Sequence, residues 1–397
     1  MRTIIILLFS LFFSHSIFAQ IKPGFDKYEG RDMISLCNSF TQIGLFNTDV
    51  DIVPSTYKKY YTSGIYGLDN KFQIWRKSNY AVIVFRGSTA EKSSWLENMY
   101  SVMISAEDQI VLPGMDTVKY KFASDDNARV QAGWSLGVAF LIQDLVHEIN
   151  LLNKDGIYDF FITGHSQGGA LSHLSRAFLE NLPEGVISAK CQFKTYAFAS
   201  PMVGNEAFVK EYTQRFVASG MSFSIYNPDD MVPKMPITVS EKSEKIVTLE
   251  NFESLLDSNS NVTFKSLGLK ALTKTMLKDP VKTYIKTAGY NVHNQIEKKL
   301  GHIIMPKYSR DLNYISTNKK INIGSFDKLS DQIVSKEEEG DSLPPTILDY
   351  RKRIEDLRGG KMYQHKPYNY YLYFLKMYFN NEYQLIIKEE RYEWNNF

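Results

Sequence analysis

The sequence predicts an α/β fold with a mostly parallel central sheet, and three observations support this prediction. Short apolar runs have the length of buried strands and lie at 80–85, 158–163, 191–199 and 222–227. The segments 131–152 and 203–217 between them carry apolar residues at helical spacing. The string Gly164-His165-Ser166-Gln167-Gly168-Gly169 joins one such run to an amphipathic segment. Strands that alternate with helices form right-handed crossovers and therefore parallel neighbours.

The first part of the chain adds elements that precede this alternation. Residues 27–47 are predicted to be helical. Residues 72–75 and 80–85 are predicted to pair as strands, with a turn at 77–79.

The N-terminus, residues 1–19, is predicted to be an export signal. Arg2 supplies the positive end, residues 4–13 are apolar, and Ile17-Phe18-Ala19 resembles a cleavage site. An apolar core of about ten residues is too short to cross a bilayer. We therefore expect a mature chain from Gln20 that is secreted or periplasmic.

The rest of the chain divides into three predicted parts. The core comprises residues 20–236. Residues 237–360 are rich in Lys, Ser and Asn, contain amphipathic stretches and a charged linker at 336–342, and are expected to form a largely helical insertion. The chain returns to core-like residues in the C-terminal segment 361–397.

Composition excludes some function classes. The formal net charge of +2 gives no electrostatic support for a nucleic-acid partner. No phosphate loop, metal-ligand spacing or dinucleotide fingerprint is present, so we expect neither cofactor nor metal. Cys37 and Cys191 form either a bridge in an exported protein or two free thiols. The sequence does not indicate an oligomeric state.

The string 164–169 has the pattern of a sharp strand-to-helix turn that exposes a nucleophile. Gly164 and Gly168 flank Ser166 at positions −2 and +2, where a Cβ would block the bend. A serine hydroxyl becomes nucleophilic when an imidazole takes its proton and a carboxylate orients the imidazole. At such a turn the partners follow in the order Ser, acid, His. The candidate acids are Asp229 and Asp230, and the candidate bases are His293, His302 and His365.

Four sequence blocks resemble the class 3 lipases, the α/β-hydrolase branch that includes secreted fungal triacylglycerol lipases. The blocks are Val84-Phe85-Arg86-Gly87-Ser88 with Trp95 and Asn98 downstream, residues 164–170, Phe198-Ala199-Ser200-Pro201-Met202-Val203-Gly204-Asn205, and Asp230-Met231-Val232-Pro233-Lys234-Met235-Pro236. They cover about residues 70–236 in the family's order. The resemblance implies an α/β-hydrolase fold, a mostly parallel sheet flanked by helices.

The resemblance also implies roles for residues of this chain. Ser166 would be the nucleophile and Asp230 the acid, with Asp229 as the alternative acid. The backbone N–H groups of Ser88 and Gln167 would hold the oxyanion. His365-Lys366-Pro367-Tyr368-Asn369-Tyr370 fits the family's His-x-x-x-Asn-Tyr pattern, while His302 and His293 stay open as alternatives. About 135 residues separate Asp230 from His365, far more than in the compact fungal enzymes.

The expected function is an exported serine hydrolase that cleaves carboxylic esters, with lipid esters of the triacylglycerol lipase or phospholipase A1 type as the favoured substrates. Because the imidazole base must be neutral, activity should rise with pH through about 6–7. The apolar segment 99–115 is expected to be either a mobile lid that contacts a lipid interface or ordinary core. A non-catalytic lipid-binding or surface-interaction protein and an acyltransferase remain alternatives on the same fold.

Overall fold

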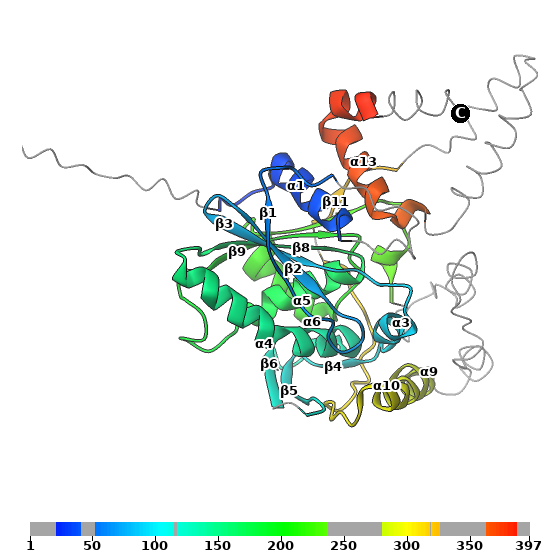
Figure 1. Ribbon diagram of the computed structural model, residues 1–397. Helices are drawn as coiled ribbons and strands as arrows, with labels where there is room; N and C mark the ends of the chain where they lie inside the picture. The colour runs from blue at the N-terminus through cyan, green and yellow to red at the C-terminus, as the bar shows by residue number, and fades with distance from the viewer. Residues whose placement is uncertain are drawn as a thin grey trace, which may run out of the picture.

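The central element is a twisted sheet that carries helices on both faces (Figure 1). The computed structural model describes residues 21–40, 52–114, 117–236, 280–317, 319–325 and 363–386. Within them a seven-stranded sheet has the order β1-β2-β3-β8-β9-β10-β11. Its strands are β1 (Lys58–Thr62), β2 (Phe72–Lys77), β3 (Tyr80–Phe85), β8 (Asp159–His165), β9 (Gln192–Phe198), β10 (Ser222–Tyr226) and β11 (Ile321–Asn322).

The sheet is antiparallel at one edge and parallel from β3 onward. β1 pairs with β2 and β2 with β3 in antiparallel fashion, the second pair being the predicted hairpin. The pairs β3–β8, β8–β9, β9–β10 and β10–β11 are parallel. Because parallel strands end at the same edge, the loops after β3, β8 and β10 emerge close together. The predicted mostly parallel sheet is confirmed.

Alternation along each strand separates two hydrophobic clusters. On β3, Ala81, Ile83 and Phe85 pack in the larger cluster. Val82 and Val84 face the other side and pack in the second cluster. This period of two is what a strand buried on both faces requires.

Two groups of helices cover these faces. α1 (Lys27–Asn38) and α13 (Pro367–Tyr378) pack together on one side, and α4 (Ala132–Lys154), α5 (Gln167–Leu179) and α6 (Glu206–Tyr212) cover the other (Figure 1). The predicted helix at 203–217 is α6 continued by a π-helical turn, η1 (Thr213–Val217). The part of the predicted helix 27–47 beyond residue 40 lies outside the described residues.

α4 is the one described helix that is long and apolar enough to cross a membrane by length and composition. Its most apolar stretch is 67% buried inside the protein. It packs against α3 (Lys92–Met99) and α5. We therefore assign it as a core helix.

The segment 99–115 corrects one of our two interpretations, the mobile lid. It forms β4 (Met103–Ser105) and β5 (Glu107–Val111), which pair with β7 (Arg129–Gln131) and β6 (Thr117–Lys121) respectively. Val102, Met103 and Ile104 are fully buried. Their apolar character therefore follows from packing in the core rather than from contact with lipid.

The described part of the predicted insertion is helical in its first half only. α9 (Pro280–Tyr284), the π-helical η4 (Ile285–Asn291) and α10 (Val292–Leu300) form one helical stretch. After it the chain departs from the prediction, because residues 301–317 and 319–323 run along the core. Ile304 bridges to Val111, Ile315 bridges to Gly204, and β11 joins the sheet. Backbone pairing with the core thus prevails over helix formation in this stretch.

The two cysteines lie on different elements and do not pair. The Sγ atom of Cys37 on α1 lies 3.3 Å from the Thr163 hydroxyl, and Cys191 contacts Asn153. Of the two interpretations left open, the structure has two free thiols.

Candidate active site

Ser166 occupies a strained turn between β8 and α5. Its backbone has φ +61° and ψ −127°, a conformation that non-glycine residues rarely adopt. A Cβ on Gly164 would collide with the backbone of Gly168, and one on Gly168 would collide with the Phe85 carbonyl. The two glycines therefore permit the bend in the way the sequence predicted. Strain of this kind is found at functional sites.

The side chains of Ser166, His365 and Asp230 form one hydrogen-bonded line. The Ser166 Oγ lies 2.8 Å from His365 Nε2, and His365 Nδ1 lies 2.7 Å from Asp230 Oδ2. The exposed fractions of the three residues are 7%, 1% and 2%. Ser166 follows β8, Asp230 follows β10, and His365 ends the short helix η5 (Tyr363–His365) before α13. The structure thus brings together the three residues that the sequence proposed.

The competing residues lie elsewhere. Asp229 is exposed. His302 has a side chain that is 80% exposed, and its Nδ1 lies 2.6 Å from Glu297 Oε1. The Nδ1 atom of His293 is 3.0 Å from the hydroxyl of Tyr100.

Two further groups hold the Asp230 carboxylate. Its Oδ1 accepts from the backbone N–H of Val232 at 2.9 Å, and its Oδ2 accepts from the Tyr370 hydroxyl at 2.7 Å. Burial, together with the adjacent Asp230, raises the pKa of Tyr370 well above its usual value. The phenol therefore keeps its proton and donates a hydrogen bond to the carboxylate. The same hydroxyl accepts from the backbone N–H of Asn227 at 3.1 Å, which ties α13 to the loop after β10.

We expect Tyr370→Phe to lower both activity and stability. The change leaves one carboxylate oxygen with a single partner and the Asn227 N–H without its acceptor, which should cost about 1–3 kcal/mol of unfolding free energy. Looser orientation of His365 should lower kcat about tenfold. Denaturant unfolding and steady-state ester hydrolysis would measure both. Tyr373→Phe is the matched control, because the Tyr373 hydroxyl donates to Gln364 instead; equal effects of the two variants would contradict the assignment.

His165 lies beside the base without adding charge. Its ring centroid is 4.7 Å from that of His365. Burial, and then the neighbouring His365, hold the pKa of His165 well below its usual value. His165 therefore stays neutral, and its ring supports the face of the His365 imidazole.

The loop after β3 places Ser88 next to the turn. A Cβ on Gly87 would lie 2.8 Å from the carbonyl of His165, so the absence of a side chain allows the close approach. Ser88 and Gln167 are both buried. Among the described residues, neither backbone N–H of this pair donates to a protein acceptor. Two such donors beside a nucleophile are what a developing oxyanion needs.

Sequence reasoning missed two side chains at this site. Tyr370 belongs to the His-x-x-x-Asn-Tyr pattern that begins at His365, but the pattern alone does not show that its hydroxyl donates to Asp230. Glu97 follows the apolar pair Trp95-Leu96 and has an exposed fraction of 0%. A single acidic residue on a helix normally faces solvent, so no signal in the sequence marked it.

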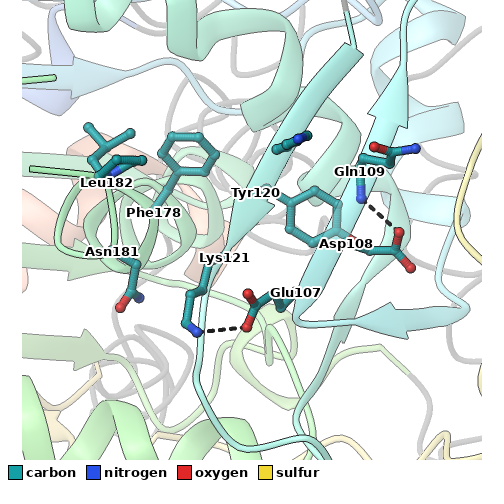
Figure 2. Close-up of a pocket in the computed structure, with 10 residues that line it drawn as sticks. Glu107, Asp108, Gln109, Tyr120, Lys121, Phe178, Asn181 and Leu182 are labelled. Carbon is teal, nitrogen blue, oxygen red and sulfur yellow. Dashed lines mark hydrogen bonds and ion pairs between the residues drawn. The ribbon is translucent and has the colours of Figure 1, made fainter.

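A separate cavity of about 440 Å³ opens between the β5–β6 hairpin and the end of α5 (Figure 2). Glu107, Lys121, Phe178 and Asn181 line part of it. Ser166 caps the other end of α5, and a helix of 13 residues is about 20 Å long. The cavity is therefore separate from the serine site.

This protein has a mostly parallel sheet, and the turn between β8 and α5 places a serine next to a histidine and an acid. This combination is typical of the α/β-hydrolase fold. Within this class, residues 82–240 match the model of the class 3 lipase family. The resemblance indicated by the four sequence blocks is thereby confirmed over residues 82–240.

The chain is also similar to curated relatives over part of their length. A secreted mono- and diacylglycerol lipase of Penicillium cyclopium is 31% identical over 113 residues, 28% of this chain and 34% of the relative. One from Fusarium solani is 34% identical over 79 residues, 20% of this chain and 21% of the relative. The chain thus spans about a third or less of these relatives' lengths. The structure of the Rhizomucor miehei triacylglyceride lipase has a TM-score of 0.39 and 20% identity, covering 53% of this chain and 74% of that one.

Proposed function

We propose that this protein is a serine hydrolase that cleaves carboxylic esters through Ser166, His365 and Asp230. The observation that carries the proposal is the line of hydrogen bonds from Asp230 through His365 to a serine held at positive φ. A buried carboxylate that orients an imidazole toward a serine hydroxyl is the arrangement that makes the hydroxyl nucleophilic.

The reaction follows from this geometry. Ser166 Oγ attacks the ester carbonyl while His365 Nε2 takes its proton, and the Asp230 carboxylate stabilises the imidazolium. The N–H groups of Ser88 and Gln167 hold the negative oxygen of the tetrahedral intermediate. The intermediate collapses to an acyl-enzyme as His365 protonates the leaving alcohol. Water then attacks the acyl group by the same steps in reverse, which releases the acid and restores Ser166.

Lipid esters are the proposed substrate class. The support is the class 3 lipase match and the relatives, which are named mono- and diacylglycerol lipases and secreted proteins. The signal peptide proposed at 1–19 lies outside the described residues, and export of this chain stays part of the proposal. Because most apolar residues of 99–114 are buried in the core, the lipid assignment does not rest on a lid there.

A series of p-nitrophenyl esters from acetyl to palmitoyl tests the substrate class. We expect turnover by the mature protein to increase with acyl-chain length, because longer chains bury more apolar surface on binding. Spectrophotometric release of p-nitrophenol measures it, with Ser166→Ala as the blank. Serine-dependent turnover that is confined to short chains would replace a lipase with a short-chain esterase.

A further inference from the structure

The carboxyl group of Glu97 is buried on the helix that follows the loop carrying Ser88. Glu97 lies on α3 with an exposed fraction of 0%. Among the ion pairs of the described residues, none includes Glu97. Burying a carboxyl group without a cation is costly, so its presence here calls for a cause other than stability.

Two amide groups donate to this carboxyl group. Glu97 Oε1 accepts from Gln167 Nε2 at 2.8 Å, and Oε2 accepts from Asn70 Nδ2 at 2.5 Å. An amide has a donor end and an acceptor end, so an acceptor-only partner determines which way it points. Gln167 Nε2 also donates to Asn70 Oδ1 at 3.2 Å. Glu97, together with this amide oxygen, therefore turns the carbonyl end of Gln167 toward the opposite side.

That carbonyl end accepts hydrogen bonds from the loop after β3, which carries Ser88, and from the helix that follows it. Gln167 Oε1 accepts from the Ser88 hydroxyl at 2.9 Å and from the Ser94 hydroxyl at 3.2 Å. Asn98 Nδ2 donates to Ser88 Oγ at 2.8 Å. Ser88 is thus held from both sides, and one hydrogen-bonded path leads from Glu97 through Gln167 to it. Gln167 and Ser88 are the two residues whose backbone N–H groups are the proposed oxyanion donors.

Resting on the function proposed above, we propose that Glu97 is a positioning residue for the oxyanion hole. Glu97 accepts a hydrogen bond from Gln167 and so orients the carboxamide that holds the Ser88 hydroxyl. This fixes the position of the Ser88 backbone N–H, which is proposed to bind the negative oxygen of the tetrahedral intermediate. Glu97 itself does not contact the substrate.

The ionisation of Glu97 should be visible in the activity. Burial raises the pKa of this carboxyl to about 8, against the lowering effect of the bonds from Asn70 and Gln167, and Asp69 raises it further. The neighbouring elements place few charges near this carboxyl. Asp69, which pairs with Arg86, lies in the loop before β2. α4 faces Glu97 with Gly133 and Gly137, and α5 faces it with Gln167. Below about pH 8 a protonated oxygen stops accepting, so one amide must turn. We therefore expect a second rise in rate through about pH 8.

A reciprocal exchange tests the proposal. Glu97→Gln replaces one of the two acceptor oxygens by a donor. Gln167 Nε2 then meets a donor in either arrangement: the new amide group itself, or the amide group of an Asn70 that has turned, because Gln167 Nε2 also donates to Asn70 Oδ1 at 3.2 Å. We therefore expect Gln167 to turn away from Ser88. In the double variant Glu97→Gln with Gln167→Glu, the new amide at position 97 can donate to the new carboxylate at position 167 and accept from Asn70. The carboxylate at position 167 can still accept from Ser88. The pattern of donors and acceptors around Ser88 is thereby restored.

The readout is the rate at which a fluorophosphonate labels Ser166 in the full-length mature protein. In this reaction the Ser166 O–P bond forms, the P–F bond breaks, His365 takes the serine proton and fluoride leaves, so the rate depends on the oxyanion hole without an ester substrate. Removing an oxyanion donor typically costs about 10²–10³ in rate, and misplacing one should cost about 10–100-fold. Above about pH 8, where wild-type Glu97 is ionised, we expect this loss in Glu97→Gln and recovery to within about fivefold in the double variant. We expect no rise through pH 8 in Glu97→Gln.

Thermal unfolding separates positioning from folding. Above about pH 8, where Glu97 is ionised, Glu97→Gln removes a buried charge, so we expect its Tm there to be unchanged or higher while labelling slows. Labelling of Glu97→Gln at the wild-type rate would overturn the inference. A slow double variant with a lowered Tm would also overturn it, because Glu97 would then be structural. Wild-type protein that is folded but unlabelled at Ser166 would instead refute the proposed function, and the inference with it.

Discussion

Replacing Ser166 with alanine is expected to lower kcat for ester hydrolysis by about 10⁶-fold, since removal of a triad serine leaves only the contribution of substrate binding and oxyanion stabilisation. Alanine is no larger than serine, so the turn at positive φ should persist and Tm should change little. Steady-state hydrolysis of p-nitrophenyl butyrate and thermal unfolding would measure both quantities.

Ser175→Ala is the matched control for this variant. Ser175 lies on the same helix, α5, and is buried. Among the described residues its hydroxyl has no hydrogen-bond partner, so its loss should leave kcat within about twofold. A Ser166→Ala protein that retained a tenth of wild-type turnover would refute a serine mechanism.

Replacing His365 with alanine should lower kcat by about 10⁴–10⁶-fold, because no other group in the described site can take the proton of Ser166. His302→Ala is its control and should keep wild-type activity, since the His302 side chain is exposed and pairs with Glu297. The acids allow the same comparison. Asp230→Asn should lower kcat about 10⁴-fold, whereas Asp229→Asn, at an exposed position, should leave kcat almost unchanged.

These pairs test the two choices that the sequence left open. If His302→Ala were the inactive variant and His365→Ala the active one, the hydrogen bond between His365 and Ser166 would have no catalytic meaning. Unfolding curves for all four variants would separate loss of chemistry from loss of fold.

Much of the fold could be predicted because its signals are local. The strand at 158–163, the turn at Ser166 and the helix after it follow from apolar length, glycine spacing and helical periodicity. The order of the partners along the chain also limited the acids to two neighbours and the bases to three histidines. These rules need no knowledge of long-range contacts.

The parts that the sequence left open, predicted wrongly or missed depend on tertiary packing. An apolar stretch such as 99–115 fits a lid or a buried strand equally well, and only pairing of β4 with β7 decides between them. Residues 301–317 look polar and irregular, yet Ile304 pairs with Val111 and Ile315 with Gly204, which places this stretch against the core. The burial of Glu97 depends on glycines of α4 that lie about forty residues away, at Gly133 and Gly137.

The most direct test of the central claim is peptide mapping of the mature wild-type protein after reaction with a fluorophosphonate. The account predicts a single phosphonyl group on Ser166, formed in wild type and absent from His365→Ala on the same timescale. Folded wild-type protein with Ser166 unmodified, or equal labelling of His365→Ala, would contradict a serine nucleophile activated by His365.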